Sequence, residues 1–172
     1  MGVAWPTSRA ALLAALLLAL PAPAAAQDAG WSTESGPGIA AGPVHRLIWK
    51  NESNDEFALS CSERIISLDA QTRDLSLRSG EPFSSFPLEL VLTVDGTEYR
   101  SPDAGGADYG YFLTITEVGT FPGKIHTALK AGPKAISLSL YNAATGSRRA
   151  IELTTDGLSP ALLAFNALCF MT

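Results

Sequence analysis

The segment around Ser159 comes closer to a catalytic motif than any other in this sequence. Residues 157–161 are Gly-Leu-Ser-Pro-Ala, one residue away from the Gly-x-Ser-x-Gly turn that presents a nucleophilic serine between a strand and a helix. A hydrolase of that class places its histidine base after the serine, and no histidine follows Ser159. Serine is also a favoured N-cap and proline a favoured first helical residue. We therefore interpret Ser159 as the cap of a helix and expect no catalytic residue.

Histidine, cysteine and aspartate side chains could bind a metal, but their spacing does not favour it. His45 and His126 are isolated from each other and belong to no metal-binding pattern, so we expect each to be a surface or half-buried residue. Asp103 and Asp108 lie in a glycine-rich loop without the alternate-residue spacing of calcium ligands. We expect neither a metal ion nor a cofactor.

Three carboxylates lie together in the polar run of residues 51–56. Glu52, Asp55 and Glu56 could suggest acid–base catalysis, but consecutive charges in a turn are usually solvated and titrate normally. We interpret the run as an exposed hairpin loop. The net charge of −5 and the total of only 12 Lys and Arg residues leave little basis for a phosphate-binding face, so nucleic acid is not expected as a partner.

The aromatic residues beside the glycine-rich loop form the best candidate for binding. Tyr109, Tyr111 and Phe112 follow Gly105 and Gly106 closely. Aromatic rings offer a large contact area at low entropic cost. Together with Asp103 and Asp108, Tyr109 and Tyr111 make up a possible binding loop; the alternative is that these rings only pack against the core and the edge of the sheet.

The first 26 residues have the character of a bacterial signal peptide. One positive charge at Arg9 precedes an Ala/Leu run from Ala10 to Leu20, and Ala24 and Ala26 supply the small residues that signal peptidase requires. The apolar run is shorter than the roughly 20 residues needed to span a bilayer. We expect a mature protein without a membrane span that is periplasmic or secreted.

An exported protein meets oxidising conditions, in which paired cysteines usually form disulfides. Cys61 and Cys169 are the only cysteines of the chain. Cys61 alternates with Phe57 and Leu59, and Cys169 follows Leu162 and Phe165 at helical spacing. We predict a structural Cys61–Cys169 disulfide; the alternative is two buried free thiols.

The elements that would position these residues are mainly strands. After the leader we expect a flexible lead-in over residues 27–42 and a single domain over residues 43–172. Apolar alternation and turn signals predict strands at 44–50, 57–61, 65–68, 74–78, 88–94, 97–100, 111–116, 136–141 and around 151–153, with a loop over 101–110. Helical spacing predicts a short helix over 122–130 and a C-terminal helix from Leu158. The predicted fold is an antiparallel β-sandwich with these two helices.

The C-terminal part of the chain resembles a known family. Leu129-Lys130-Ala131-Gly132 before an alternating strand, the turn at 142–146, a returning strand and the helix at 161–168 are similar to the end of small exported bacterial proteins of the invasion-associated locus B type. The resemblance covers roughly 45 residues. It implies a periplasmic or secreted β-sandwich without known catalytic residues.

These observations favour a non-enzymatic function. We expect an exported binding or envelope-accessory protein that holds an envelope protein or a cell-wall component through a sheet edge or the loop at 101–111. The alternatives are a small periplasmic hydrolase or an inhibitor of one, and a purely structural envelope component.

The leader makes a first testable prediction. The exported protein should begin at about Gln27, because Ala24 and Ala26 are the small residues on which cleavage depends. N-terminal sequencing of the exported form tests this, and a start before Ala10 would contradict it.

Overall fold

The computed structural model describes residues 30–37, 42–63, 65–102 and 105–170. The predicted signal peptide and Asp103 lie outside the described residues. Among the residues within these ranges, no helix is long and apolar enough to cross a bilayer.

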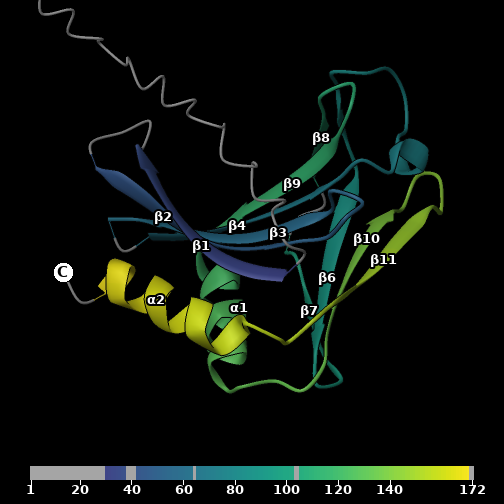
Figure 1. The fold of residues 1–172 in the computed structure, drawn as a ribbon. Helices are drawn as coiled ribbons and strands as arrows, with labels where there is room; N and C mark the ends of the chain where they lie inside the picture. Colours follow the sequence, from purple (N-terminus) through teal and green to yellow (C-terminus); the bar gives the residue numbers. More distant parts are fainter. Residues whose placement is uncertain (1–29, 38–41, 64, 103–104, 171–172) are drawn as a thin grey trace, which may run out of the picture.

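The protein is mainly β and contains two antiparallel sheets and two helices, so the predicted fold class is confirmed (Figure 1). The seven-stranded sheet, called sheet A, has the order β1 (Gly30–Pro37), β2 (Pro43–Lys50), β3 (Glu56–Ser62), β4 (Ile65–Thr72), β9 (Leu113–Val118), β8 (Gly106–Asp108) and β5 (Ser85–Phe86). The four-stranded sheet B has the order β11 (Arg148–Leu153), β10 (Ile136–Asn142), β6 (Leu88–Val94) and β7 (Thr97–Arg100).

Helices α1 (Thr120–Lys130) and α2 (Leu158–Phe170) pack against sheet A beside sheet B (Figure 1). Their buried residues, among them Ile125, Leu129, Leu162 and Phe165, join the same core as the inward residues of both sheets. The helices and sheet B therefore share the inner face of sheet A.

Strict alternation forms the core. In β3, Phe57, Leu59 and Cys61 point into the core, and in β6 Leu88, Leu90, Leu92 and Val94 do the same. Asp95 and Gly96 both adopt positive φ, at 47° and 81°, and close the predicted β6–β7 hairpin. These local predictions are confirmed.

Three predicted elements differ in the structure. Within the lead-in, residues 30–37 form β1, which pairs with all of β2; Trp31 packs on Phe57 and its indole N–H donates to the Thr154 carbonyl. The predicted strand at 65–68 is present and continues to Thr72 as β4, whereas the predicted strand at 74–78 is a 3₁₀ helix at Leu75–Leu77. The predicted loop at 101–110 contains the short strand β8.

Helix α2 begins at Leu158, directly after Gly157. Ser159 is therefore an exposed residue of the first turn rather than the N-cap that we expected. Pro160 is tolerated there because first-turn N–H groups have no partner within the helix.

Asp55 is also placed differently from the expected exposed loop. Its side chain is buried, with 1% of its surface exposed, and accepts hydrogen bonds from Thr72 Oγ1 at 2.6 Å and from Arg149 Nη2 at 2.7 Å. The hydrogen bond to Asp55 raises the pKa of Arg149. Because Thr72 belongs to sheet A and Arg149 to sheet B, this cluster ties the two sheets together.

The predicted disulfide is present. Cys61 of β3 and Cys169 near the end of α2 are bonded, with a Cα–Cα distance of 6.1 Å. The bond joins the C-terminal helix to the inner face of sheet A.

Replacing either cysteine with serine should lower the free energy of unfolding by roughly 2 to 5 kcal/mol. Helix α2 should open first, because it is terminal and loses its covalent link to β3. Urea unfolding and amide hydrogen exchange measure the two effects, and unfolding of the wild type under reducing conditions is the control. A Cys169→Ser protein as stable as the oxidised wild type would contradict a structural role.

Candidate functional site

Four aromatic residues form an exposed cluster at one end of sheet A. Phe83, Tyr109 and Tyr111 expose 78%, 48% and 68% of their surfaces, and Phe112 lies among them. Phe112 is stacked on Tyr109 with ring centroids 4.9 Å apart, and it meets Tyr111 edge-to-face at the same distance. We call Phe83, Tyr109, Tyr111 and Phe112 the aromatic surface.

The turn between β8 and β9 holds three of these rings. The Tyr109 N–H donates to the Phe112 carbonyl at 3.0 Å, which closes the turn. Gly110 within it has a φ of 85°, a conformation that suits glycine. The turn therefore presents Tyr109, Tyr111 and Phe112 as one unit.

Phe83 joins the cluster from a different segment of the chain, just before β5. A Cβ atom on Gly110 would lie 2.9 Å from Cζ of Phe83, so the Phe83 ring rests directly on this glycine. Phe83 itself has a φ of 64°, which is costly for a bulky side chain. Backbone strain of this kind is often found at functional sites.

An ion pair between the half-buried Arg78 and the buried Asp108 fixes the turn. The Arg78 guanidinium binds both carboxylate oxygens of Asp108, and its Nη2 also donates to the Gly110 carbonyl at 2.9 Å. The Gly110 N–H donates in turn to Asp108 Oδ1 at 2.6 Å. The hydrogen bond from Arg78 lowers the pKa of Asp108 against the opposing effect of burial.

The structure separates the residues of the predicted binding loop. Tyr109 and Tyr111 are exposed together, whereas Asp108 exposes only 3% of its surface and anchors the turn. Phe83 and Arg78 were missed because they lie more than 20 residues away in sequence. The available signal for Phe83 was an aromatic residue between Pro82 and Ser84 in the stretch after Gly80.

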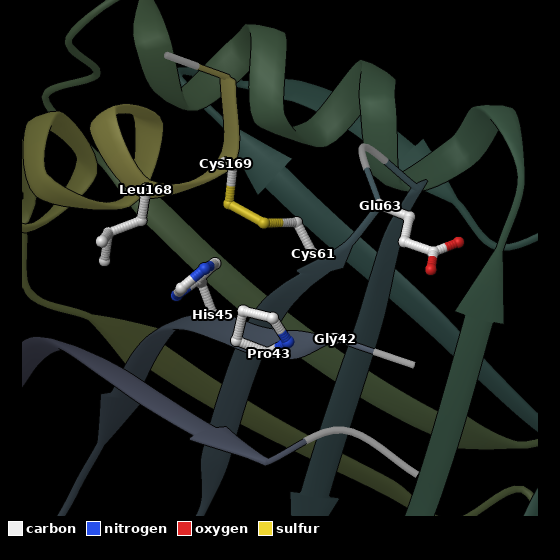
Figure 2. A pocket seen from close by; sticks show the side chains of 7 residues that line it. All are labelled: Gly42, Pro43, His45, Cys61, Glu63, Leu168 and Cys169. Carbon is white, nitrogen blue, oxygen red and sulfur yellow. A yellow bond between two sulfur atoms is a disulfide. The ribbon is translucent and has the colours of Figure 1, made fainter. Parts of the chain in front are cut away.

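The disulfide borders a cavity of about 230 Å³, separate from the aromatic surface. Figure 2 shows His45 and Leu168 on one side of the two sulfur atoms and Glu63 on the other. Ser35 Oγ and His45 Nδ1 are hydrogen-bonded at 2.8 Å across β1 and β2. Because both sulfurs are oxidised, this cavity offers no thiolate for catalysis.

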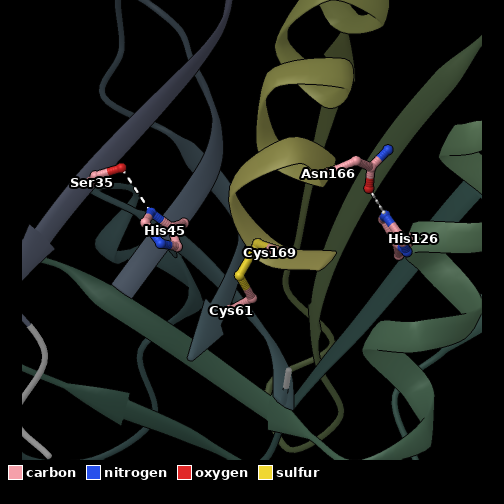
Figure 3. The surroundings of a disulfide bond; sticks show 6 residues. All are labelled: Ser35, His45, Cys61, His126, Asn166 and Cys169. Carbon is pink, nitrogen blue, oxygen red and sulfur yellow. Dashed lines mark hydrogen bonds between the residues drawn. A yellow bond between two sulfur atoms is a disulfide. The ribbon is translucent and has the colours of Figure 1, made fainter. Parts of the chain in front are cut away.

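His126 of α1 lies between the two helices, where it contacts α2. Its Nε2 donates to Asn166 Oδ1 at 2.7 Å, and Figure 3 shows His126 and His45 on opposite sides of the disulfide. Burial lowers the pKa of His126. Within the described part of the chain, no three His, Cys, Asp or Glu side chains gather as metal ligands.

Comparison of the chain with protein families, curated proteins and solved structures finds no match. The function must therefore be argued from the chain's own surface.

The Arg78–Asp108 pair makes a prediction about stability. Asp108→Asn should lower the free energy of unfolding at pH 7 by roughly 2 to 3 kcal/mol, less than for a fully buried pair because Arg78 keeps some contact with water. Urea unfolding of both proteins measures the difference.

The pH dependence follows from the lowered pKa of Asp108. The folded state binds this proton less readily than the unfolded state, whose pKa is near 3.8, so the stabilisation is present above that pH and is lost as the pH falls below it. The stability difference between wild type and Asp108→Asn should therefore shrink below about pH 4. A constant difference between pH 7 and pH 3 would contradict this.

Proposed function

We propose that this protein is an exported, non-enzymatic binding protein that holds a component of the cell envelope through its aromatic surface. The observation that carries the proposal is the exposure of Phe83, Tyr109 and Tyr111 in one cluster. Exposed apolar patches of this kind mark interaction sites more often than they serve folding.

The way in which the rings are held supports binding. The Arg78–Asp108 pair and the closed turn fix the backbone beneath Tyr109 and Tyr111, and ring–ring packing restricts their side chains. A surface that is already ordered loses little conformational entropy when it binds. Rigid aromatic anchors are also the residues that most often dominate binding energy.

The expected export of the protein supports a partner in the cell envelope. Residues 1–26 have the pattern of a signal peptide, and the oxidised Cys61–Cys169 pair is typical of proteins in an oxidising compartment. Residues 129–168 resemble invasion-associated locus B proteins, which is consistent with an exported protein. On the basis of this resemblance we propose that the chain belongs to that family.

The proposal is tested with the mature protein and a variant carrying Tyr109→Ala and Tyr111→Ala. Co-sedimentation with isolated bacterial cell envelopes and with purified cell-wall sacculi measures binding. The variant should bind at least tenfold more weakly, because two exposed anchors of this type are worth roughly 2 kcal/mol or more.

Leu163→Ala is the matched control. Leu163 is as exposed as Tyr111, at 66%, but it lies on α2 away from the aromatic surface, so its removal should leave binding unchanged. Envelope binding that is equal in the wild type and the tyrosine variant would overturn the proposal.

A further inference from the structure

A polar groove crosses the outer face of sheet A, the face turned away from the core. Its cavity volume is about 420 Å³, and its polar lining includes Arg46, Glu56, Ser60, Ser67, Asp69 and Gln71. These side chains come from β2, β3 and β4, at alternate positions to the core residues.

Strand register places most groove residues in two cross-strand rows, separated by the row that contains Asp69. Arg46 lies opposite Ser60, and Ser60 lies opposite Ser67. In a second row Gln71 lies between Glu56 and Thr114. The groove therefore extends over four adjacent strands, from β2 to β9.

The charges at the groove balance, because the cations Arg46 and Lys50 are matched by the carboxylates of Glu56 and Asp69. Arg46 Nη2 donates to Glu56 Oε1 at 2.6 Å, and Lys50 Nζ lies 3.2 Å from Glu56 Oε2. Arg46 reaches Glu56 across the row that contains Ile48 and Ala58, and both of these residues are fully buried although they belong to the outer face. Cations that are paired in this way do not favour an anionic ligand.

Other polar groups of the groove, by contrast, are available. Among the described residues, the side chains of Ser60, Ser67 and Gln71 make no hydrogen bond, although only 8% of Ser60 is exposed. Asp69 uses Oδ1 to accept a hydrogen bond from Thr116 at 2.7 Å, which leaves Oδ2 as an acceptor. The groove thus presents hydroxyl, amide and carboxylate groups whose partners must come from outside the fold.

The aromatic surface continues directly into this groove. In β9, Leu113 and Ile115 point into the core, so Thr114 points outward into the groove. Phe112 directly precedes β9 and lies two residues before Thr114, so continued alternation places it on the outer side, roughly 7 Å from Thr114. Tyr109 is stacked on Phe112 and extends the apolar end of this face.

We infer that the ligand is a neutral, hydroxyl-rich polysaccharide chain that lies across the outer face of sheet A, from the aromatic surface into the groove. This inference rests on the proposed function and names its ligand class. The apolar C–H faces of sugar rings match exposed aromatic rings, and sugar hydroxyls match unpaired serine, glutamine and aspartate groups. The groove alone crosses four adjacent strands spaced about 4.8 Å apart, so it is longer than a single sugar ring.

Isothermal titration calorimetry with neutral hexasaccharides tests the inference, using β-linked chains of glucose, xylose and N-acetylglucosamine as probes. The wild type should bind at least one of these hexasaccharides more tightly than the corresponding monosaccharide. A variant with Ser67→Ala and Gln71→Ala should bind that hexasaccharide at least tenfold more weakly. Its stability should be nearly unchanged, because neither side chain makes a hydrogen bond within the described structure.

A double variant with Thr93→Ala and Ser137→Ala is the matched control. These two polar residues are cross-strand neighbours on sheet B and also lie at outward positions, away from the groove. The control variant should bind the hexasaccharide as tightly as the wild type.

The outcomes separate this inference from the proposed function. If no hexasaccharide binds, or if the Ser67/Gln71 variant binds as well as the wild type, the polysaccharide inference is overturned. If envelope binding still depends on Tyr109 and Tyr111 in that case, the proposed function stands with a ligand of another chemical class. If the tyrosine variant also binds envelopes normally, the proposed function fails as well.

Discussion

Each strand of the two sheets packs one face against the shared core and turns the other face away from it, and this constraint shapes both the core and the proposed binding face. In β3, Phe57, Leu59 and Cys61 lie inside, while Glu56 and Ser60 lie outside. The strand register that places the apolar residues in the core therefore also sets the spacing of the polar residues that line the groove. A shift of one residue would move the polar side chains into the core, so the two faces are specified together.

Sheet A is wider than sheet B, and the remaining part of its inner face is covered by helices. The Cys61–Cys169 bond holds α2 on this face, and His126 links α1 to α2 through Asn166. At the opposite end of β3 from Cys61, the Asp55–Arg149 pair joins the two sheets. These interactions hold the strands of sheet A in place. The geometry of the outer groove depends on them, because the residues that line it come from separate strands.

Signals that are local in sequence were sufficient for much of the fold. The alternation of residues 88–94 with Asp95-Gly96 predicted its hairpin, and the apolar surroundings of Cys61 and Cys169 predicted their pairing. Features that depend on distant partners were missed: β1 carries only one large apolar residue, Trp31, and is formed by pairing with β2. Asp55 is buried because Arg149 reaches it from 94 residues away. Tyr109 and Tyr111 were found as candidates, but the groove depends on the register of three strand pairs and has no signature in one segment.

The contrast between paired and unpaired polar groups on sheet A is the strongest reason to regard its outer face as a binding surface. Glu56 pairs with both Arg46 and Lys50, and Arg78 pairs with Asp108, so these charged groups already have partners inside the protein. The hydroxyls of Ser60 and Ser67 have no hydrogen-bond partner within the described residues, and the rings of Tyr111 and Phe83 remain largely exposed. Folding thus leaves neutral hydrogen-bonding groups beside exposed rings, and a ligand that combines hydroxyls with apolar faces satisfies both kinds of group at once.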